Sequence, residues 1–378
     1  MKILHVIPDL SPETGGPVRA ILGLSRKQRQ RGHAVSIIST DFGLSQNSAR
    51  IDENIEACKC VFGPWRYAPS LGNLLVQKTE WCDVLHIHTL WEYPTLLAAR
   101  LARQCGKPFL LRPCGMLDTW SLSQSRMRKR MYLSLFNKTL FSPPCLLHFT
   151  TQSEKEKSLV PFNPPSVVIE NGISEEAMSD ALPDVFLNRF PDLRGKRLLL
   201  FLGRVHQKKR PDIAIQAFSR VATRFPDSML VVAGPCDEGY RHELTKLCTS
   251  SGLENRVRFT GILHGREVYG AYRSASAFLL PSMQENFGMA VAEAMAASCP
   301  VVISEHVDLK DYIRDGDAGI ICSADIESFA SALGELLSKP LLARKMGQNA
   351  KALAHQYFTW GRAAERLDQV YTQLIHYS

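Results

Sequence analysis

Short runs of apolar and β-branched residues alternate along the chain with longer segments in which apolar residues recur every three or four positions. The short runs are typical of buried strands, and the longer segments are typical of amphipathic helices. Their alternation predicts an α/β fold with parallel sheets covered by helices. We expect strands at residues 3–7, 34–39, 84–88, 109–112, 146–150 and 167–169 in the first half, and at 198–202, 228–233, 257–259, 277–280, 301–303 and 319–321 in the second.

One gap interrupts this alternation. Residues 171–197 show little periodicity and contain two glycines and two prolines, which is typical of a linker. We therefore predict two Rossmann-like domains, residues 1–185 and 186–358, followed by a single amphipathic helix within residues 359–378. The other predicted helices are residues 18–31, 96–104, 212–224, 240–250, 266–274 and 289–297.

Composition agrees with a soluble globular protein. Hydrophobic residues make up 45% and charged residues 22% of the sequence, and no apolar run is long enough to cross a bilayer. Residues 1–7 form too short an apolar run for a secretory signal. The ten cysteines are scattered, as is typical of a reducing compartment, and Cys58 and Cys60 lack the spacing of a redox or zinc motif. We therefore expect a cytoplasmic protein.

The formal net charge is +8, from 45 basic and 37 acidic residues, and it favours anionic partners such as nucleotides or anionic lipid. A basic cluster at residues 126–130 runs directly into the apolar and aromatic segment 131–136. Two interpretations of this segment stay open. It forms either a helix that lies on an anionic membrane surface or an ordinary amphipathic helix with a solvated basic face.

Residues 281–304 carry the strongest chemical signal. Glu285 follows an apolar strand, Asn286-Phe287-Gly288 forms a turn, and Met289 opens a helix that carries Glu293 in its second turn. The free N–H groups and the dipole of a helix N-terminus attract an anion. A carboxylate on each side of this turn suits a ligand with a phosphate in the middle and hydroxyls at both ends, as in a nucleotide sugar. The alternative is that the glutamates are ordinary cap residues.

Two further turns are suited to phosphate. Gly203-Arg204 ends a predicted strand and is followed by Lys208, Lys209 and Arg210, so cations gather where a diphosphate could bind. Such cations can neutralise a departing nucleoside diphosphate without a metal. Gly15 and Gly16 lie at another strand-to-helix turn, where small residues allow a close approach to the backbone. The alternative for the basic segment is a solvated loop.

The other polar motifs give weaker signals. His86 and His88 alternate on one face of a predicted strand end, without a third metal ligand at a suitable spacing. We expect His88 to hydrogen-bond a sugar and His86 to be a buried structural residue. Asp315-Gly316-Asp317 is interpreted as a turn and not as a metal site.

Taken together, these residues resemble family 4 of the retaining glycosyltransferases, which have the GT-B fold. The resemblance covers nearly the whole chain and is carried by several motifs in order. They are Gly15-Gly16, residues 83–88, 115–117, 151–154 and 170–173, Gly203-Arg204 with Lys209, and the segment with the two glutamates. The resemblance implies two Rossmann-like domains facing across a cleft, with the C-terminal helix crossing back to the first domain.

The resemblance also implies residue roles. Arg204 and Lys209 would bind the donor diphosphate, and Glu285 would contact hydroxyls of the donor sugar. Glu293 would bind the ribose. Gly16 would approach the diphosphate from the opposite domain, and no metal cofactor is expected. The backbone amides of Asn286, Phe287, Gly288 and Met289 would hold the phosphate.

The sequence departs from the family pattern at two positions. Arg210 follows Lys209 where the family usually has glycine, and Cys114 stands where many members have a histidine that meets the donor sugar. Arg112 or His88 would then take over that sugar contact.

The sequence therefore predicts a retaining, metal-independent glycosyltransferase. It would move a hexose from a UDP-sugar or GDP-sugar to a glycan or polyprenyl-linked acceptor, in bacterial surface polysaccharide biosynthesis. The expected location is the cytoplasm or the inner face of the membrane, in contact with anionic lipid and without nucleic acid as a partner. The alternatives are a GT-B nucleotide-sugar epimerase and a non-catalytic protein that binds nucleotides or nucleic acid.

Overall fold

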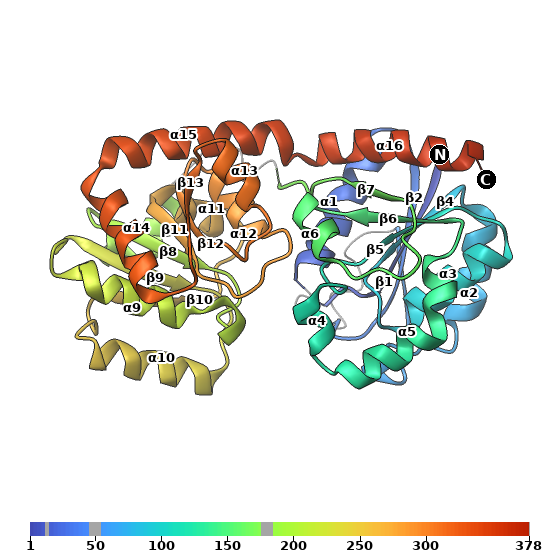
Figure 1. The fold of residues 1–378 in the computed structure, drawn as a ribbon, viewed down its shortest axis with the longest axis horizontal. Helices are drawn as coiled ribbons and strands as arrows, with labels where there is room; N and C mark the ends of the chain where they lie inside the picture. Colours follow the sequence, from blue (N-terminus) through green and yellow to red (C-terminus); the bar gives the residue numbers. More distant parts are fainter. Residues whose placement is uncertain (12–14, 45–53, 175–183, 378) are drawn as a thin grey trace. The chain divides into compact units, whose positions relative to one another are not determined.

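The computed structural model describes residues 1–11, 15–44, 54–174 and 184–377. The chain divides into two compact units (Figure 1). Unit 1 consists of residues 1–172 together with 360–378, and unit 2 consists of residues 173–359. Each unit contains one parallel sheet surrounded by helices, so the predicted pair of Rossmann-like domains is confirmed.

Unit 1 is built on a seven-stranded parallel sheet with the strand order β3-β2-β1-β4-β5-β6-β7. Its central strands β1 and β4 are buried along nearly their whole length, which explains their continuous apolar sequence. The strands are β1 (Lys2–Asp9), β2 (Ala34–Thr40), β3 (Ile55–Cys58), β4 (Val84–His88), β5 (Phe109–Arg112), β6 (Cys145–Phe149) and β7 (Ser166–Val168). The helices are α1 (Gly16–Gln30), α2 (Leu71–Trp81), α3 (Tyr93–Gln104), α4 (Thr119–Ser123), α5 (Arg126–Phe141), α6 (Gln152–Lys157) and α16 (Trp360–Tyr377).

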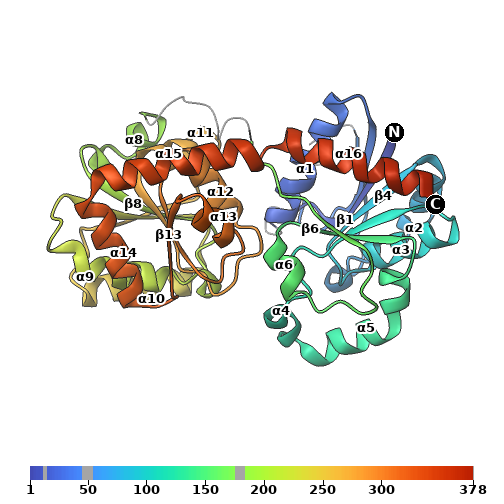
Figure 2. The same ribbon diagram turned by 45° about the horizontal axis from the view of Figure 1, so that its top comes forward.

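The C-terminal helix α16 belongs to unit 1, as the resemblance implied (Figure 2). Ala363, Ala364, Leu367 and Tyr371 on one of its faces share a buried core with Leu24 of α1 and with residues of the sheet. At its first turn, a Cβ atom on Gly23 would lie 2.3 Å from the Trp360 indole. The apolar face of the predicted amphipathic helix is therefore buried against unit 1.

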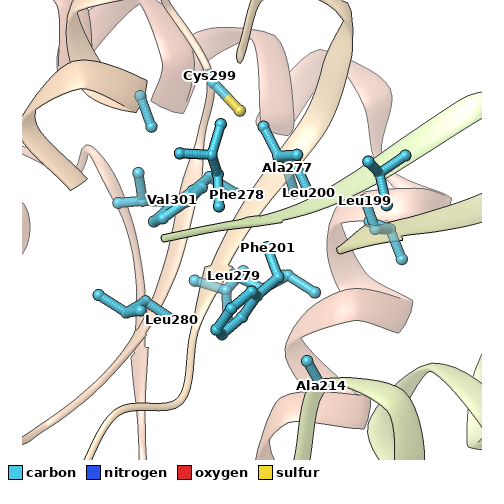
Figure 3. Packing of buried hydrophobic residues seen from close by; sticks show 14 of the residues in the cluster. Leu199, Leu200, Phe201, Ala214, Ala277, Phe278, Leu279, Leu280, Cys299 and Val301 are labelled. Atoms are coloured by element: carbon cyan, nitrogen blue, oxygen red, sulfur yellow. The ribbon is translucent and has the colours of Figure 1, made fainter. Parts of the chain in front are cut away.

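Unit 2 is built on a six-stranded parallel sheet with the strand order β10-β9-β8-β11-β12-β13. Figure 3 shows side chains from β8, β11 and β12 gathered with Ala214 of α9 in its core. The strands are β8 (Arg197–Leu202), β9 (Ser228–Ala233), β10 (Val257–Gly261), β11 (Ala275–Leu280), β12 (Val301–Ser304) and β13 (Gly319–Cys322). The helices are α8 (Asp184–Arg189), α9 (Pro211–Ala222), α10 (Glu238–Ser250), α11 (Arg266–Ser274), α12 (Met289–Ala296), α13 (Lys310–Asp315), α14 (Ile326–Ser338) and α15 (Pro340–Tyr357).

The structure adds elements that the apolar pattern did not predict. The edge strand β3 has only four residues, and Glu56 interrupts its apolar character. Within the predicted linker, residues 184–189 form helix α8 and residues 191–193 form the short 3-10 helix η4. Phe186, Phe190 and Leu193 from these elements are buried in the core of unit 2. Burial of three apolar side chains therefore orders a segment that lacks regular periodicity.

Among the helices of the described residues, none combines the length and the apolar character needed to cross a bilayer.

Candidate functional site

The candidate site in unit 2 lies where β8 and β11 end. Parallel α/β sheets bind ligands at the carboxyl ends of their strands. Glu285 and Lys209 meet there: the Lys209 Nζ lies 2.6 Å from the Glu285 Oε2, and the two side chains keep 17% and 21% of their surfaces exposed. The structure thus brings together two residues that lie 76 positions apart in the sequence.

Main-chain hydrogen bonds fix both partners of this ion pair. The Glu285 N–H donates to the His306 carbonyl at 3.2 Å, and the Glu285 carbonyl accepts from Asp308 N–H at 3.0 Å. Lys209 ends the 3-10 helix η5 (Gln207–Lys209), whose Lys208 carbonyl accepts from Met283 N–H at 2.9 Å. The loops that follow β8 and β11 therefore hold each other, and the charged pair is set by backbone geometry.

Gly288 caps the N-terminus of α12 in a left-handed conformation, with a φ of 78°. A Cβ atom at this position would lie 3.3 Å from Glu285 Cγ and 3.3 Å from Val291 Cγ2. Glycine therefore allows the turn and also allows Glu285 to pack closely over it. Phe287 is buried against Phe358, with ring centroids 5.4 Å apart, and anchors the turn in the core.

Glu293 lies in the second turn of α12 and is only 6% exposed. Its Oε2 accepts a hydrogen bond of 3.1 Å from the hydroxyl of Tyr272, a fully buried residue of α11. The carboxylate is thus oriented by a buried partner. Asn286 and Met289 lie between the two glutamates, at the end of the turn and at the start of the helix.

The remaining basic residues differ in their environment. Arg204 is exposed in the loop after β8. Arg210 has a φ of 52°, so the backbone occupies the left-handed region in which glycine is the least strained residue. The glycine that the resemblance led us to expect at position 210 would adopt this conformation with less strain. The Arg210 guanidinium forms an ion pair with Asp212 at 2.8 Å. Beside it lies a cavity of about 450 Å³ lined by Gln207, Tyr240, Glu243 and Met283.

Unit 1 places Gly16 at the first position of α1, after Gly15 with a φ of 72°. Among the described residues, no atom would lie within 4 Å of a Cβ on Gly16. This is what a close approach by a ligand requires. The neighbouring residues 12–14, part of the predicted glycine loop, lie outside the described residues.

Arg112 is the last residue of β5, and Cys114 lies two positions after it. Arg112 is 3% exposed and donates from Nη2 to the Asn171 Oδ1 at 2.6 Å. Cys114 has a φ of 55°, and burial raises the pKa of its thiol. The adjacent Gly115 N–H donates to the Glu154 Oε1 at 2.7 Å. The Cys114 position is therefore held by the backbone around it.

His86 and His88 are fully buried in β4. The sequence offered no third residue for a cluster with them, but the sheet places His5 of β1 and His148 of β6 beside them. His5 Nδ1 lies 3.0 Å from His88 Nε2, and His148 Nδ1 lies 3.1 Å from His86 Nε2. Ligand atoms of His5, His86 and His88 all lie within 4.8 Å of one another. These partners come from strands far apart in the sequence, so no local motif could reveal them.

Burial controls the protonation of this cluster. It lowers the pKa of His5 to about 4 and that of His148 to about 3, and it holds the pKa values of His86 and His88 well below the usual range. All four imidazoles are therefore neutral near pH 7. In contrast to the ion pair in unit 2, this cluster carries no charge.

Comparison with known proteins identifies what the two units are similar to. The family model described as "Glycosyl transferases group 1" matches residues 187–353, and the model described as "Glycosyl transferase 4-like domain" matches residues 15–172. An uncharacterized glycosyltransferase of Methanocaldococcus jannaschii is 27% identical over 98% of both chains. The phosphatidyl-myo-inositol mannosyltransferase of Mycolicibacterium smegmatis is 26% identical over 98% of this chain and 93% of its own.

The fold is also similar to solved structures. The crystal structure of Anabaena HepE in complex with UDP and glucose superposes with a TM-score of 0.80 at 18% identity, over 99% of this chain and 100% of that chain.

Proposed function

The chain belongs to the group 1 glycosyltransferases and has the GT-B fold, and from this membership we propose that it is a retaining, metal-independent hexosyltransferase. Its donor is a UDP-sugar or a GDP-sugar, and its acceptor is a glycan or a lipid-linked saccharide. The observation that carries this proposal is the Lys209–Glu285 ion pair, held beside the N-terminus of α12.

The ion pair suits the two ends of the reacting bond. In the proposed complex, the Lys209 ammonium and the exposed Arg204 guanidinium face the diphosphate, where negative charge grows as the glycosidic bond breaks. Preorganised cations at such a position stabilise the transition state more than the ground state. Glu285 accepts hydrogen bonds from hydroxyls of the sugar. Because these residues supply positive charge themselves, the proposed reaction has no need of a metal ion.

Glu293 suits the other end of the donor. A carboxylate has about four lone-pair directions, and Tyr272 occupies one of them. In the proposed complex, this carboxylate also accepts hydrogen bonds from the two hydroxyls of a ribose. The turn from Asn286 to Met289 lies between Glu285 and Glu293, where the phosphates of the same donor would meet the positive end of the α12 dipole.

In this proposal, the anomeric configuration is retained because the acceptor hydroxyl attacks the sugar from the same face that the diphosphate leaves. The departing phosphate oxygen takes the proton of the acceptor hydroxyl as the new glycosidic bond forms. The charge of the leaving group is held by Lys209 and Arg204, so no protein nucleophile is required.

The carboxyl edge of the unit 1 sheet supports a saccharide acceptor. Trp65 is 37% exposed, its ring centroid lies 6.0 Å from that of Tyr93, and its Nε1 donates to the Trp91 carbonyl at 3.2 Å. Glu92 directly precedes Tyr93 in the sequence, and burial raises the pKa of its carboxyl. Aromatic faces stack on the C–H faces of sugars, and carboxyl groups bind their hydroxyls. Trp65→Ala should raise the KM for the acceptor and leave the Kd for UDP unchanged.

Helix α5 supports contact with an anionic membrane. Met127, Met131 and Leu135 are spaced by four residues and are 86%, 63% and 66% exposed, so they form one apolar stripe on the helix surface. Arg126, Arg128 and Arg130 are exposed on the same helix. This combination suits an interfacial helix on anionic lipid. Co-sedimentation with phosphatidylglycerol vesicles should be reduced in the variant Met131→Gln/Leu135→Gln and should be absent with phosphatidylcholine vesicles.

The setting that we propose is surface polysaccharide assembly on the inner face of a bacterial membrane. All ten cysteines are free thiols, which agrees with the reducing cytoplasm. The apolar stripe of α5 would bring the enzyme to membrane-bound acceptors.

A thermal-shift panel of UDP-, GDP- and ADP-sugars tests the donor. We expect one nucleotide class to raise the melting temperature, with and without EDTA, and failure of every donor would refute the proposal. Nuclear magnetic resonance of the product then reports the configuration at the anomeric carbon. Recovery of an isomerised nucleotide sugar, without transfer or hydrolysis, would favour the alternative function of a nucleotide-sugar epimerase.

A further inference from the structure

The buried histidines form one continuous chain of hydrogen bonds in unit 1. Besides the His148–His86 and His5–His88 contacts, His86 Nδ1 lies 2.7 Å from the hydroxyl of Tyr371 on α16. Gln28 of α1 links the two halves. Its Nε2 donates to the Tyr371 hydroxyl at 3.3 Å, and its Oε1 lies 2.7 Å from His5 Nε2. At the end of the chain, His148 Nε2 lies 2.9 Å from the Ile169 carbonyl.

That carbonyl fixes the direction of the first half. A carbonyl oxygen only accepts, so His148 carries its proton on Nε2, and its Nδ1 must be an acceptor because the ring is neutral. His86 therefore donates from Nε2 to His148, and its Nδ1 accepts from the Tyr371 hydroxyl. Tyr371 has then used its only proton.

The second half follows from this constraint. The Tyr371 oxygen must accept from Gln28, which places the amide nitrogen of Gln28 toward Tyr371 and its oxygen toward His5. His5 donates to that oxygen from Nε2, so its Nδ1 accepts from His88 Nε2. His88 is thus protonated on Nε2, and its Nδ1 has only a lone pair to offer.

The His88 end of this chain of hydrogen bonds offers an acceptor, and Arg112 on the next strand offers a donor. His88 and Arg112 are paired in register on the adjacent strands β4 and β5, so their side chains leave the sheet on the same face. Among the buried side-chain atoms of the described residues, His88 Nδ1 and Arg112 Nε both lack a hydrogen-bond partner. One atom is an acceptor and the other a donor, and a hydroxyl group can satisfy both.

We propose that Tyr371 is a positioning residue, which holds His88 as the Nε2–H tautomer through this chain of hydrogen bonds. His88 Nδ1 and Arg112 Nε then form a binding point for one hydroxyl group. The hydroxyl belongs either to an enclosed water molecule or to a substrate sugar. The tautomer assignment is independent of the proposed transferase activity, and only the sugar source rests on it.

A metal site on His5, His86 and His88 is the competing interpretation. It requires an unprotonated nitrogen from each ligand directed at one ion. In the chain of hydrogen bonds, His88 Nε2 carries the proton that His5 Nδ1 accepts, so a metal could bind both facing atoms only if that proton left Nε2. The hydrogen bonds already satisfy the atoms that a metal would need.

Nuclear magnetic resonance of protein labelled with ¹⁵N in its histidine rings tests the proposal on the intact chain. We expect His5, His86, His88 and His148 to show a protonated Nε2 and an unprotonated Nδ1 between pH 6 and 8. A protonated His88 Nδ1, or displacement of these ring protons by added Zn²⁺, would overturn the assignment.

Tyr371→Phe removes the hydroxyl at the centre of the chain. We expect the His88 ring signals to change from one tautomer to two in exchange, although residue 371 does not touch His88. Thr372→Val, which removes an exposed hydroxyl from the next position of α16, should leave them unchanged. If His88 keeps a single Nε2–H tautomer in a folded Tyr371→Phe protein, Tyr371 is not the positioning residue.

Two further spectra identify the hydroxyl. A shift of His88 Nδ1 on addition of UDP-glucose but not of UDP indicates a sugar hydroxyl. A Nδ1 that is hydrogen-bonded in the free protein and unmoved by UDP-glucose indicates an enclosed water. A Nδ1 with no hydrogen bond in either sample contradicts the binding point.

Discussion

The two units handle polar side chains at their sheets in opposite ways. In unit 2, Lys209 and Glu285 come from loops beyond the strand ends, carry opposite charges and stay about one-fifth exposed. In unit 1, His5, His86 and His148 lie within the strands, are buried and are neutral. Position along a strand therefore decides the role of a polar group. Beyond the strand it can meet a ligand, and within the strand it must be satisfied by its neighbours.

The cost of protonation differs accordingly. Charging a buried imidazole is unfavourable, whereas the Lys209–Glu285 pair is already charged and partly solvated.

The largest effect should be acid destabilisation of unit 1. Folding lowers the histidine pKa values, so the unfolded chain takes up protons first as the pH falls below about 6.5. Stability is complete above that pH and decreases on acidification toward the folded pKa values of about 4 for His5 and about 3 for His148. Each histidine should contribute a loss of up to about 1.4 kcal/mol per pH unit.

Hydrogen exchange at pH 7, 6 and 5 checks this for each unit separately. Amides of β4 should lose protection before those of β11. Equal loss in the two units, or unchanged protection of β4 at pH 5, would remove the contrast between them.

Loss of the exposed ion pair should act on catalysis and leave stability nearly unchanged. Lys209→Ala removes the cation proposed to face the leaving diphosphate, and we expect kcat to fall by about two to three orders of magnitude. Lys339→Ala is a matched control, because Lys339 forms a 2.9 Å ion pair with Glu335 on the surface. Transfer assays should find the control within about twofold of the wild type. Similar rates in both variants would refute the role of Lys209.

Glu293→Gln should have an intermediate effect. The amide oxygen can still accept from Tyr272, but the negative charge offered to a ribose is lost. We expect the Kd for the nucleoside diphosphate to rise about tenfold, the loss of one charged hydrogen bond. Calorimetric titration measures it, with Glu335→Gln as the surface control. An unchanged Kd would mean that Glu293 serves the fold alone.

Gly288→Ala should have the smallest effect on donor binding. It separates the backbone strain of an alanine at a positive φ from the contact of its Cβ with Glu285. Gly252 has a similar φ of 66°, but no atom of the described residues lies within 4 Å of a Cβ built there. Both alanines should cost about 1 kcal/mol of stability through the left-handed backbone. Only Gly288→Ala should also weaken donor binding, because its Cβ would crowd Glu285. Equal donor affinity in the two variants would show that this close packing is dispensable.

The strands other than β3 could be predicted from the sequence because parallel strands are continuous apolar runs. Several helices, among them α2, α14 and α15, were not predicted. β3 was missed because a four-residue edge strand with a glutamate has no clear pattern. Helix α8 was missed because its order comes from burial of Phe186 and Phe190 against the rest of unit 2. In both places, tertiary contacts order a segment whose sequence has no regular apolar periodicity.

The candidate site was predictable only in part, for the same reason. Glu285 and Glu293 share one segment, so their spacing was visible in the sequence. A family resemblance implied that Lys209 and Glu285 serve the same donor, but their ion pair was not predicted, and the role proposed for each remains a prediction. His5, His148, Gln28 and Tyr371 had no local signal, because the sheet and the last helix bring them together from distant parts of the chain.

The return of α16 to unit 1 has a consequence for biosynthesis. Residues 1–172 are synthesised first, but unit 1 lacks Tyr371 and the rest of α16 until residues 360–378 have been added. All of unit 2, residues 173–359, is synthesised between these two parts of unit 1. The unit that is translated first is therefore finished last. A chain cut after residue 359 would therefore keep every residue of unit 2 but would lack the Tyr371 hydroxyl that contacts His86 in unit 1.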